Sequence, residues 1–236
     1  LSRQNIDYEE GSHDEARILA ADCIMKSPGI PDKADIIKKA HEKHIPIISE
    51  IEFASQYTQS TIVAITGSNG KTTTTLLTHH IFKQAGLEVG LGGNIGYSFA
   101  ELVAHSNPPY YVLEISSFQL DGIEHFAPHI AVLLNITPDH LDRYNFEMMR
   151  YVRSKMRITQ NQTADDSFIY WADDEYIPSE LASHNHGQKM LPFADHKREG
   201  IVGYGQGESG NDSYGFAEGA QLKIEQPRPF EIALSQ

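Results

Sequence analysis

The residues with the clearest capacity for chemistry lie between Thr61 and Thr75, in the stretch TIVAITGSNGKTTTT. Residues 61–66 are β-branched and apolar, as in a buried strand, and a glycine-rich turn follows them directly. The turn and the start of the next helix consist of Gly67, Ser68, Asn69, Gly70, Lys71, Thr72 and Thr73. Backbone N–H groups at a helix start attract an anion, a lysine adds positive charge, and a threonine hydroxyl can ligate Mg²⁺. This stretch predicts a phosphate-binding loop for a nucleoside triphosphate, the alternative being an ordinary strand–helix turn.

Three further polar segments follow predicted strands. They are Gly92–Gly96 (GGNIG), which contains Gly93 and Asn94, then 114–119 (EISSFQ), which contains Ser116, and then 137–140 (TPDH). In an open parallel sheet, ligands bind beyond the carboxyl ends of the strands. We therefore expect these segments to converge on the phosphate loop.

Glu114 and His140 are the candidate metal ligands in these segments. Glu114 ends the apolar run YYVLE, where an unpaired carboxylate would be costly. It is either a hydrated carboxylate at a strand end or, together with Thr72, a ligand of Mg²⁺, which prefers hard oxygens. His140 is either a surface histidine or a residue of the same site.

Lys155 is a candidate because of its position on a predicted helix over residues 146–160. At about 100° per residue, Arg150, Arg153 and Arg157 share one face, and Lys155 falls on the other face among apolar side chains. Burial lowers the pKa of a lysine, and the neutral amine can add CO₂ to give a carbamate, which is an anionic metal ligand. The alternative is a lysine that extends along the surface into solvent.

The elements that must position these residues alternate along the chain. Before the phosphate loop we expect strands at 21–26 and 45–49, helices at 32–43 and 50–57, and a rigid turn at SPGI, which begins with Ser27. From residue 61 we expect strands at 61–66, 87–91, 110–115, 129–136 and 167–171 and helices at 71–85, 97–104, 146–160 and 174–183. The 71–85 helix carries an apolar stripe at Leu76, Leu77, Ile81 and Phe82. A hairpin is expected from 213–217 and 221–225, and an edge strand at 230–234.

This pattern predicts an α/β fold in two parts. Residues 1–58 form the remnant of a small Rossmann-like N-terminal domain. Residues 59–236 form a P-loop domain with a mainly parallel sheet and a small C-terminal β-hairpin region.

Composition narrows the class of protein. The net charge of −13 argues against nucleic acid or an anionic membrane as the main partner. The chain has one cysteine, Cys23, and 40% hydrophobic residues, which suits a folded protein of a reducing compartment. No apolar run approaches the ~20 residues needed to cross a bilayer, so we expect a cytoplasmic protein.

Taken in order, TGSNGKTT, GGNIG, LEISSFQL and NITPDHLDRY resemble the Mur ligases of peptidoglycan synthesis, and the resemblance covers about residues 21–174. The combination of GGNIG with EISSFQL is similar to the members of the family that add D-glutamate. Ile65 stands where a usual P-loop has its first glycine, and this departure is common in the family. The resemblance implies ATP-dependent amide bond formation between UDP-N-acetylmuramoyl-L-alanine and D-glutamate through an acyl phosphate, in a monomer.

The resemblance also implies residue roles. Residues 67–73 would hold the ATP phosphates, with Lys71 on the γ-phosphate. Thr72 and Glu114 would hold one Mg²⁺, and His140 and a carbamylated Lys155 would hold a second. The UDP-linked substrate would contact Ser27, Gly93, Asn94 and Ser116.

The family has three domains, so we expect this chain to be a partial protein without the amino-acid-binding domain, and inactive alone. A nucleotide-binding module without turnover, or another Mur-type or folylpolyglutamate-type ligase, is the alternative function. A GTPase is disfavoured because the sequence has no NKxD motif, and a simple kinase would not explain GGNIG or EISSFQL.

Overall fold

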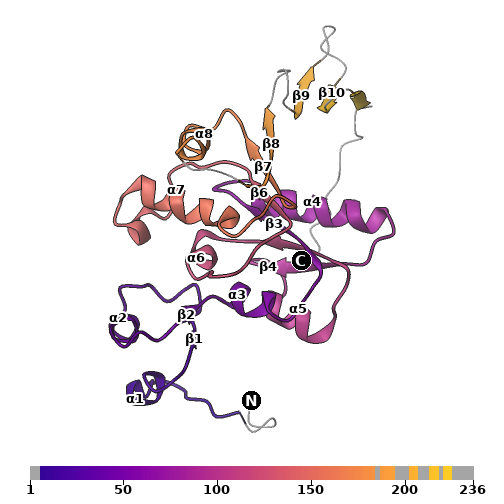
Figure 1. Cartoon of the computed structure of the whole chain (residues 1–236). Helices are drawn as coiled ribbons and strands as arrows, with labels where there is room; N and C mark the ends of the chain where they lie inside the picture. Colours follow the sequence, from indigo (N-terminus) through magenta and orange to yellow (C-terminus); the bar gives the residue numbers. More distant parts are fainter. Residues whose placement is uncertain (1–5, 184–186, 195–201, 207–212, 218–219, 225–236) are drawn as a thin grey trace.

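The computed structural model describes residues 6–183, 187–194, 202–206, 213–217 and 220–224, and it contains two sheets (Figure 1). The smaller sheet pairs β1 (Ile24–Met25) with β2 (Ile47–Ile48) in parallel. The larger sheet has nine strands in the order β11-β10-β9-β8-β7-β6-β3-β5-β4. The expected α/β class, with a small N-terminal piece and a larger, mainly parallel sheet, is confirmed.

The N-terminal piece has three short helices, α1 (Glu15–Ile18), α2 (Asp35–Glu42) and α3 (Glu50–Ser55). The sequence did not predict α1, a single turn whose first N–H groups are capped by Asp14. Although α3 falls within the predicted 1–58 domain, its Ile51 and Ala54 are buried in the main hydrophobic cluster of the larger body. Helix α3 therefore connects the two parts.

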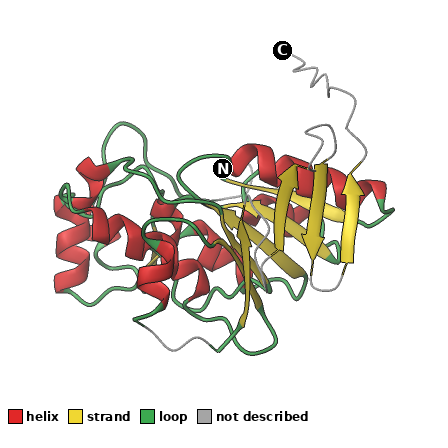
Figure 2. Ribbon diagram, turned by 90° about the horizontal axis from the view of Figure 1, so that it is seen from above, coloured by secondary structure: helices red, strands yellow, loops and turns green. Residues whose placement is uncertain are grey.

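The strands of the larger sheet lie side by side with helices flanking them (Figure 2). They are β3 (Thr61–Thr66), β4 (Val89–Gly93), β5 (Tyr110–Glu114), β6 (Ile130–Leu133), β7 (Ser167–Trp171), β8 (Lys189–Ala194), β9 (Val202–Gln206), β10 (Ser213–Ala217) and β11 (Ala220–Ile224). Strands β3 to β9 pair in parallel, and β9, β10 and β11 pair antiparallel. The predicted hairpin is confirmed as β10–β11, whereas the predicted edge strand at 230–234 lies outside the described residues.

Two strands, β8 and β9, were not predicted. Strand β8 contains Pro192, which pairs with Tyr170 of β7, and a proline inside an apolar run usually argues against a strand. Strand β9 reads VGYGQ, and its glycines weaken the strand pattern. Tertiary pairing along the sheet outweighs both local signals.

Alternation along the strands separates two hydrophobic faces. Ile62, Ala64, Tyr111 and Leu113 belong to a large cluster with residues of α3, α5 (Phe99–His105), α7 (Met148–Met156) and α8 (Ile177–Leu181). Val63, Ile65, Val112 and Val132 face the other way, against Phe82 of α4 (Lys71–Gln84). The remaining helices are the one-turn α6 (Ser117–Leu120) and the 3-10 helices η2 (Leu141–Tyr144) and η3 (Arg157–Thr159).

Of the apolar stripe expected on the first long helix, only Phe82 packs on the sheet. In α4, Leu76, Leu77 and Ile81 are 47%, 52% and 56% exposed. Thr75 is buried. Phe82 packs on the sheet, and the centroid of its ring lies 5.3 Å from the ring centroid of Tyr110. The glycine turn fixes the direction of α4, so its contact face is set by the loop and not by the most apolar residues.

Element ends differ from the prediction by a few residues. Strand β4 is displaced towards GGNIG, so Gly92 and Gly93 end the strand and do not lie in the following loop. A Cβ at Gly93 would lie 2.3 Å from the Glu114 carbonyl oxygen, so only glycine allows this approach to β5. In the described part of the chain, no helix is long and apolar enough to span a membrane.

Candidate active site

The phosphate loop joins β3 to α4 through Gly67–Gly70. Gly70 has a φ of +80°, a conformation that glycine adopts without strain. A Cβ at Gly67, where φ is +155°, would lie 3.1 Å from the Leu134 Cβ. Helix α4 has 14 residues, and the N–H groups of its first turn have no acceptor within the helix. The loop therefore has the form that binds a phosphate group.

Segment 134–137, which follows β6, holds the phosphate loop from one side. Ser68 N donates to Asn135 O at 2.9 Å, and Ser68 Oγ donates to Thr137 O at 2.8 Å. Asn69 N donates to Asn135 Oδ1 at 2.9 Å, and Asn135 Nδ2 donates to Asn69 O at 3.1 Å. The Asn69 side chain also donates to Thr137 Oγ1 at 3.0 Å. The side chains and N–H groups of Ser68 and Asn69 thus fix the loop, which leaves phosphate binding to the N–H groups at the start of α4 and to Lys71.

A buried carboxylate lies at the start of α4. Thr72 Oγ1 donates to Glu114 Oε2 at 2.7 Å, and Asn94 Nδ2 donates to Glu114 Oε1 at 2.8 Å. Glu114 is only 2% exposed. The structure therefore brings together residues from three of the predicted strand-end segments.

The same group fits a metal ion. A threonine hydroxyl and a carboxylate are hard oxygen ligands, and Mg²⁺ is usually held by one or two carboxylates plus water and substrate phosphates. Thr72 and Glu114 place these two ligands beside the phosphate loop. The residues present thus suit a Mg²⁺–triphosphate complex.

Two lysines point at one backbone oxygen of the loop. Lys71 Nζ donates to Gly67 O at 2.8 Å and to Ser68 O at 2.9 Å, and Lys155 Nζ donates to Gly67 O at 2.8 Å. Burial, together with the positive charge of Lys71, lowers the pKa of Lys155 to about 7. A large fraction of the Lys155 amine is therefore neutral near pH 7, as the addition of CO₂ requires.

The predicted faces of helix α7 are confirmed for Lys155, Arg150 and Arg153. They are not confirmed for Arg157, which is partly buried and donates to Leu120 O and Ile123 O. Lys155 and Tyr151 are 2% and 1% exposed, whereas the side chains of Arg150 and Arg153 are 56% and 69% exposed. The Tyr151 hydroxyl lies 2.9 Å from Ser68 Oγ, so α7 packs directly under the phosphate loop. The Lys155 ammonium lies 4.8 Å from the centroid of the Tyr151 ring.

His140 is a mostly exposed residue that follows β6. Its side chain is 58% exposed, and its Nε2 lies 3.5 Å from Asp139 Oδ2. Within the described residues, no three histidine, cysteine, aspartate or glutamate side chains form a group that could hold a metal. Lys155 is hydrogen-bonded to Gly67 O and the His140 side chain is mostly exposed, and their joint binding of a second metal ion stays a prediction.

Three of the residues predicted to contact the UDP-linked substrate, Ser116, Gly93 and Asn94, have structural roles. Ser116 caps α6, since its Oγ accepts from Gln119 N at 3.3 Å and its N–H donates to Gln119 Oε1 at 2.9 Å. Gly93 allows β4 to approach β5, and Asn94 binds Glu114. Ser27 is exposed in the turn before α2. Their contacts with a substrate stay predictions.

One residue that organises the site was missed from the sequence. Asp174 is 6% exposed, and its Oδ2 accepts from Ile136 N at 2.7 Å. Its Oδ1 accepts from Tyr176 N at 2.8 Å and Ile177 N at 3.0 Å. Asp174 thus ties the segment that holds the phosphate loop to α8. The available signal was a pair of aspartates directly after a strand, in WADD.

Comparisons with known proteins place this chain among relatives. The sequence profile described as the Mur ligase middle domain matches residues 65–225. A protein of Bacteroides fragilis named UDP-N-acetylmuramoylalanine–D-glutamate ligase is 55% identical over 204 residues, which is 86% of this chain and 46% of that protein. The protein of that name from Bacteroides thetaiotaomicron is 50% identical over 232 residues, which is 98% of this chain and 50% of that protein. The chain therefore spans about half the length of these curated relatives.

Solved structures show the same fold at low sequence identity. The UDP-N-acetylmuramate:L-alanyl-gamma-D-glutamyl-meso-diaminopimelate ligase of Neisseria meningitides gives a TM-score of 0.60 at 17% identity, covering 88% of this chain and 69% of that one. The MurF ligase of Thermotoga maritima, solved with ADP, gives a TM-score of 0.57 at 19% identity, covering 88% and 58%. With a family profile that matches 161 consecutive residues from 65 to 225, this chain belongs to the Mur ligase family through its middle domain.

Proposed function

We propose that this chain is the nucleotide-binding and UDP-substrate-binding part of an ATP-dependent ligase. The ligase joins D-glutamate to UDP-N-acetylmuramoyl-L-alanine in peptidoglycan synthesis. The observation that carries this proposal is the Thr72–Glu114 hydrogen bond of 2.7 Å, with Lys71 on the adjoining loop. Two relatives at 55% and 50% identity bear the name of this activity.

The phosphate end of the site accounts for the first chemical step. A carboxylate oxygen of the UDP-linked substrate attacks the γ-phosphorus of ATP, and ADP leaves, which gives an acyl phosphate. Bound Mg²⁺ supplies neutralisation of the phosphate charge. Lys71 is held in place by two loop carbonyls, and its ammonium can transfer from them to an oxygen of the γ-phosphate. Such charge placement and positioning lower the barrier to phosphoryl transfer.

The second step forms the amide bond. The amine of D-glutamate attacks the acyl carbon and loses a proton, and inorganic phosphate leaves. In this proposal Asn94, Ser116 and Ser27 contact the UDP-linked substrate. A carbamate on Lys155 and the His140 imidazole would be the ligands of a second Mg²⁺, which would supply further neutralisation of negative charge. The lowered pKa of Lys155, about 7, supports carbamate formation.

The proposal extends to the setting of the reaction. Both substrates of a ligase of this kind are small, charged and water-soluble, and we place the enzyme in the cytoplasm as a monomer. The net charge of −13 supports a protein that does not bind nucleic acid.

Turnover in the protein as expressed from its gene tests the proposal. We expect ADP release that requires UDP-N-acetylmuramoyl-L-alanine, D-glutamate and Mg²⁺ together. ADP release that prefers L-glutamate or diaminopimelate would favour another ligase of the Mur or folylpolyglutamate type. Nucleotide binding with no ADP release under any of these conditions would favour a binding module without turnover.

A further inference from the structure

The SPGI turn is hydrogen-bonded to cationic side chains from both parts of the molecule. Within the turn, Ile30 N donates to Ser27 O at 3.0 Å, the bond that closes a tight four-residue turn. Lys26, in the N-terminal piece, donates from Nζ to Ile30 O at 2.9 Å. Arg143, in the larger body, donates from Nη2 to Pro28 O at 3.2 Å. Lys26 therefore supports the turn from its own side, whereas Arg143 links the turn to the body.

The 3-10 helix η2 holds Arg143 in place. Its last residue, Tyr144, is 8% exposed, and the Tyr144 hydroxyl donates to Asp121 Oδ2 at 3.0 Å. The central carbon of the Arg143 guanidinium lies 4.4 Å from the centroid of the Phe118 ring, which is a cation–π contact. Helix η2 begins directly after His140. The residue that contacts the SPGI turn is therefore fixed to the same stretch of chain that runs past the phosphate loop.

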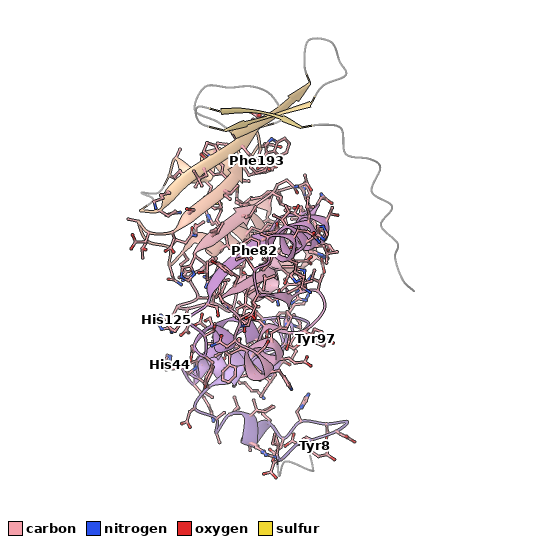
Figure 3. The ribbon with its side chains drawn as sticks, turned by 90° about the vertical axis from the view of Figure 1, so that its right-hand side faces the viewer. Tyr8, His44, Phe82, Tyr97, His125 and Phe193 are labelled. Carbon is pink, nitrogen blue, oxygen red and sulfur yellow. The ribbon has the colours of Figure 1, made fainter. Side chains whose placement is uncertain are left out.

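The N-terminal piece is also attached to the body at the start of α3. Ser49 N donates to Gly122 O at 2.8 Å. The Glu52 carboxylate, in a residue that is 1% exposed, accepts from the N–H groups of residues 124–126 at 2.8–3.1 Å. Figure 3 shows the N-terminal piece at the lower end of the molecule, below the label of His125. A piece attached at one junction can rotate about it, and a bond at a second point sets its angle.

A cleft of about 570 Å³ lies between this part of the N-terminal piece and the body. Lys26 and Asp32 line it on the side of the N-terminal piece, and Asp121 and Arg143 line it on the side of the body. Lys26 Nζ pairs with Asp32 Oδ1 at 2.8 Å, so these two charges compensate each other on their own side. The hydrogen bond from Arg143 to Pro28 O therefore joins the two parts beside a space that side chains do not fill.

We propose that Arg143 is a positioning residue that sets the angle between the N-terminal piece and the body. This inference rests on the proposed function, in which the SPGI turn contacts the UDP-linked substrate and the phosphate loop holds ATP. The reacting carboxylate lies at the far end of that substrate from the UDP group. The angle between the two parts therefore sets the distance from the carboxylate to the γ-phosphate, and a misplacement of about 1 Å can cost about 100-fold in rate. Arg143 acts through Pro28 O and needs no contact with the substrate.

Kinetic and binding measurements on the protein as expressed from its gene test the proposal, with UDP, UDP-N-acetylmuramoyl-L-alanine and Mg–ATP as probes. Arg143→Met keeps an aliphatic side chain and removes the hydrogen bond to Pro28 O. A hydrogen bond from a charged donor corresponds to roughly 10-fold to 100-fold, so we expect kcat/KM for the UDP-linked substrate to fall at least about 10-fold. The dissociation constants of UDP and ATP should change less than about 3-fold, because the turn and the phosphate loop keep their own bonds. Arg143→Lys, which can still donate to Pro28 O, should recover part of the loss.

Arg150→Met is the control for charge. The Arg150 side chain lines the same cleft, is 56% exposed and pairs with Glu147, so its loss should change kcat/KM less than about 3-fold. Unchanged kcat/KM in Arg143→Met, or an equal loss in both variants, would overturn the positioning role. So would a loss of UDP or ATP affinity in Arg143→Met as large as the loss in kcat/KM, because that result indicates direct binding or general damage. If the unaltered protein releases no ADP with the UDP-linked substrate and D-glutamate, the proposed function is wrong and the positioning role falls with it.

Discussion

Replacing Lys155 by methionine removes the ammonium group buried under the phosphate loop and keeps most of the length of the side chain. Lys155 is 2% exposed, and its amino group donates to Gly67 O at 2.8 Å. Burial, with the nearby charge of Lys71, lowers its pKa from 10.5 to about 7. The folded protein therefore binds this proton less tightly than the unfolded chain does.

The pKa difference sets the size and the sign of the effect. One pKa unit corresponds to about 1.4 kcal/mol, so below pH 7 the buried charge costs about 5 kcal/mol of folding stability. Between pH 7 and 10.5 the folded lysine loses its proton while the unfolded one keeps it, so the cost declines as pH rises. Between pH 6 and pH 9 this cost to folding stability falls by about 2.5 kcal/mol. The lost hydrogen bond to Gly67 O offsets about 1–3 kcal/mol of the gain from the substitution.

We expect Lys155→Met to be more stable than the unaltered protein at pH 6, and this advantage to shrink by about 2.5 kcal/mol at pH 9. Urea unfolding in CO₂-free buffer, without nucleotide or Mg²⁺, measures both differences. Lys38→Met is the control, because the Lys38 side chain is 57% exposed and its substitution should give no such pH dependence. If the advantage of Lys155→Met is the same at pH 6 and pH 9, the Lys155 ammonium is not desolvated and the reasoning fails.

Four further outcomes follow from the site. Lys71→Ala should cut ADP release by about 10³-fold or more, because its charge acts on the transferred phosphoryl group, while thermal melting shows unchanged stability. Glu114→Gln should raise the Mg²⁺ concentration for half-maximal turnover at least about 10-fold, measured by Mg²⁺ titration, because an amide is a weaker ligand than a carboxylate. Lys155→Ala should be nearly inactive and be partly restored by an added short carboxylic acid; rescue by amines instead would exclude the carbamate. Gly93→Ala should lower the free energy of unfolding by more than about 2 kcal/mol, since the new Cβ would lie 2.3 Å from Glu114 O at a φ of +96°, whereas Gly187→Ala, which has open space, should not.

Much of the fold could be predicted from local patterns. The β-branched run before Gly67 and the apolar run before Glu114 identify central strands, and their carboxyl ends meet at one edge because the strands are parallel. That geometry places Thr72 beside Glu114 without any knowledge of the structure. Helical periodicity likewise places Lys155 on the buried side of α7.

Other features depend on contacts between distant residues. The face that α4 presents to the sheet is fixed by the turn at Gly70, so the leucines of its apolar stripe stay exposed. Pro192 argues locally against a strand, yet β8 forms because β7 offers it a partner. Neither outcome has a signal within its own segment.

The support of the phosphate loop was also beyond local reasoning. Ser68 and Asn69 were predicted to hold phosphate, but their side chains bond to Thr137 and their backbone N–H groups bond to Asn135. Those partners are more than 60 residues away in sequence, and Asp174 secures them from a further strand end. A motif identifies residues that meet a ligand, but it does not distinguish them from residues that shape the loop around it.

Lys71 and Lys155 both donate a hydrogen bond to Gly67 O, and this shared contact affects whether the Lys155 carbamate forms before or after ATP binds. In the structure both amino groups donate to this oxygen, and the charge of Lys71 is one cause of the lowered pKa of Lys155. A lysine must lose its proton before its amine can add CO₂. While Lys71 is bonded to Gly67 O, its charge keeps the pKa of Lys155 low and favours the neutral amine. Once the Lys71 ammonium moves to a phosphate oxygen, its effect on the pKa of Lys155 weakens. If Lys155 carries the carbamate that we propose, it should form more readily before ATP binds than after, so the phosphate-binding lysine also prepares the buried amine.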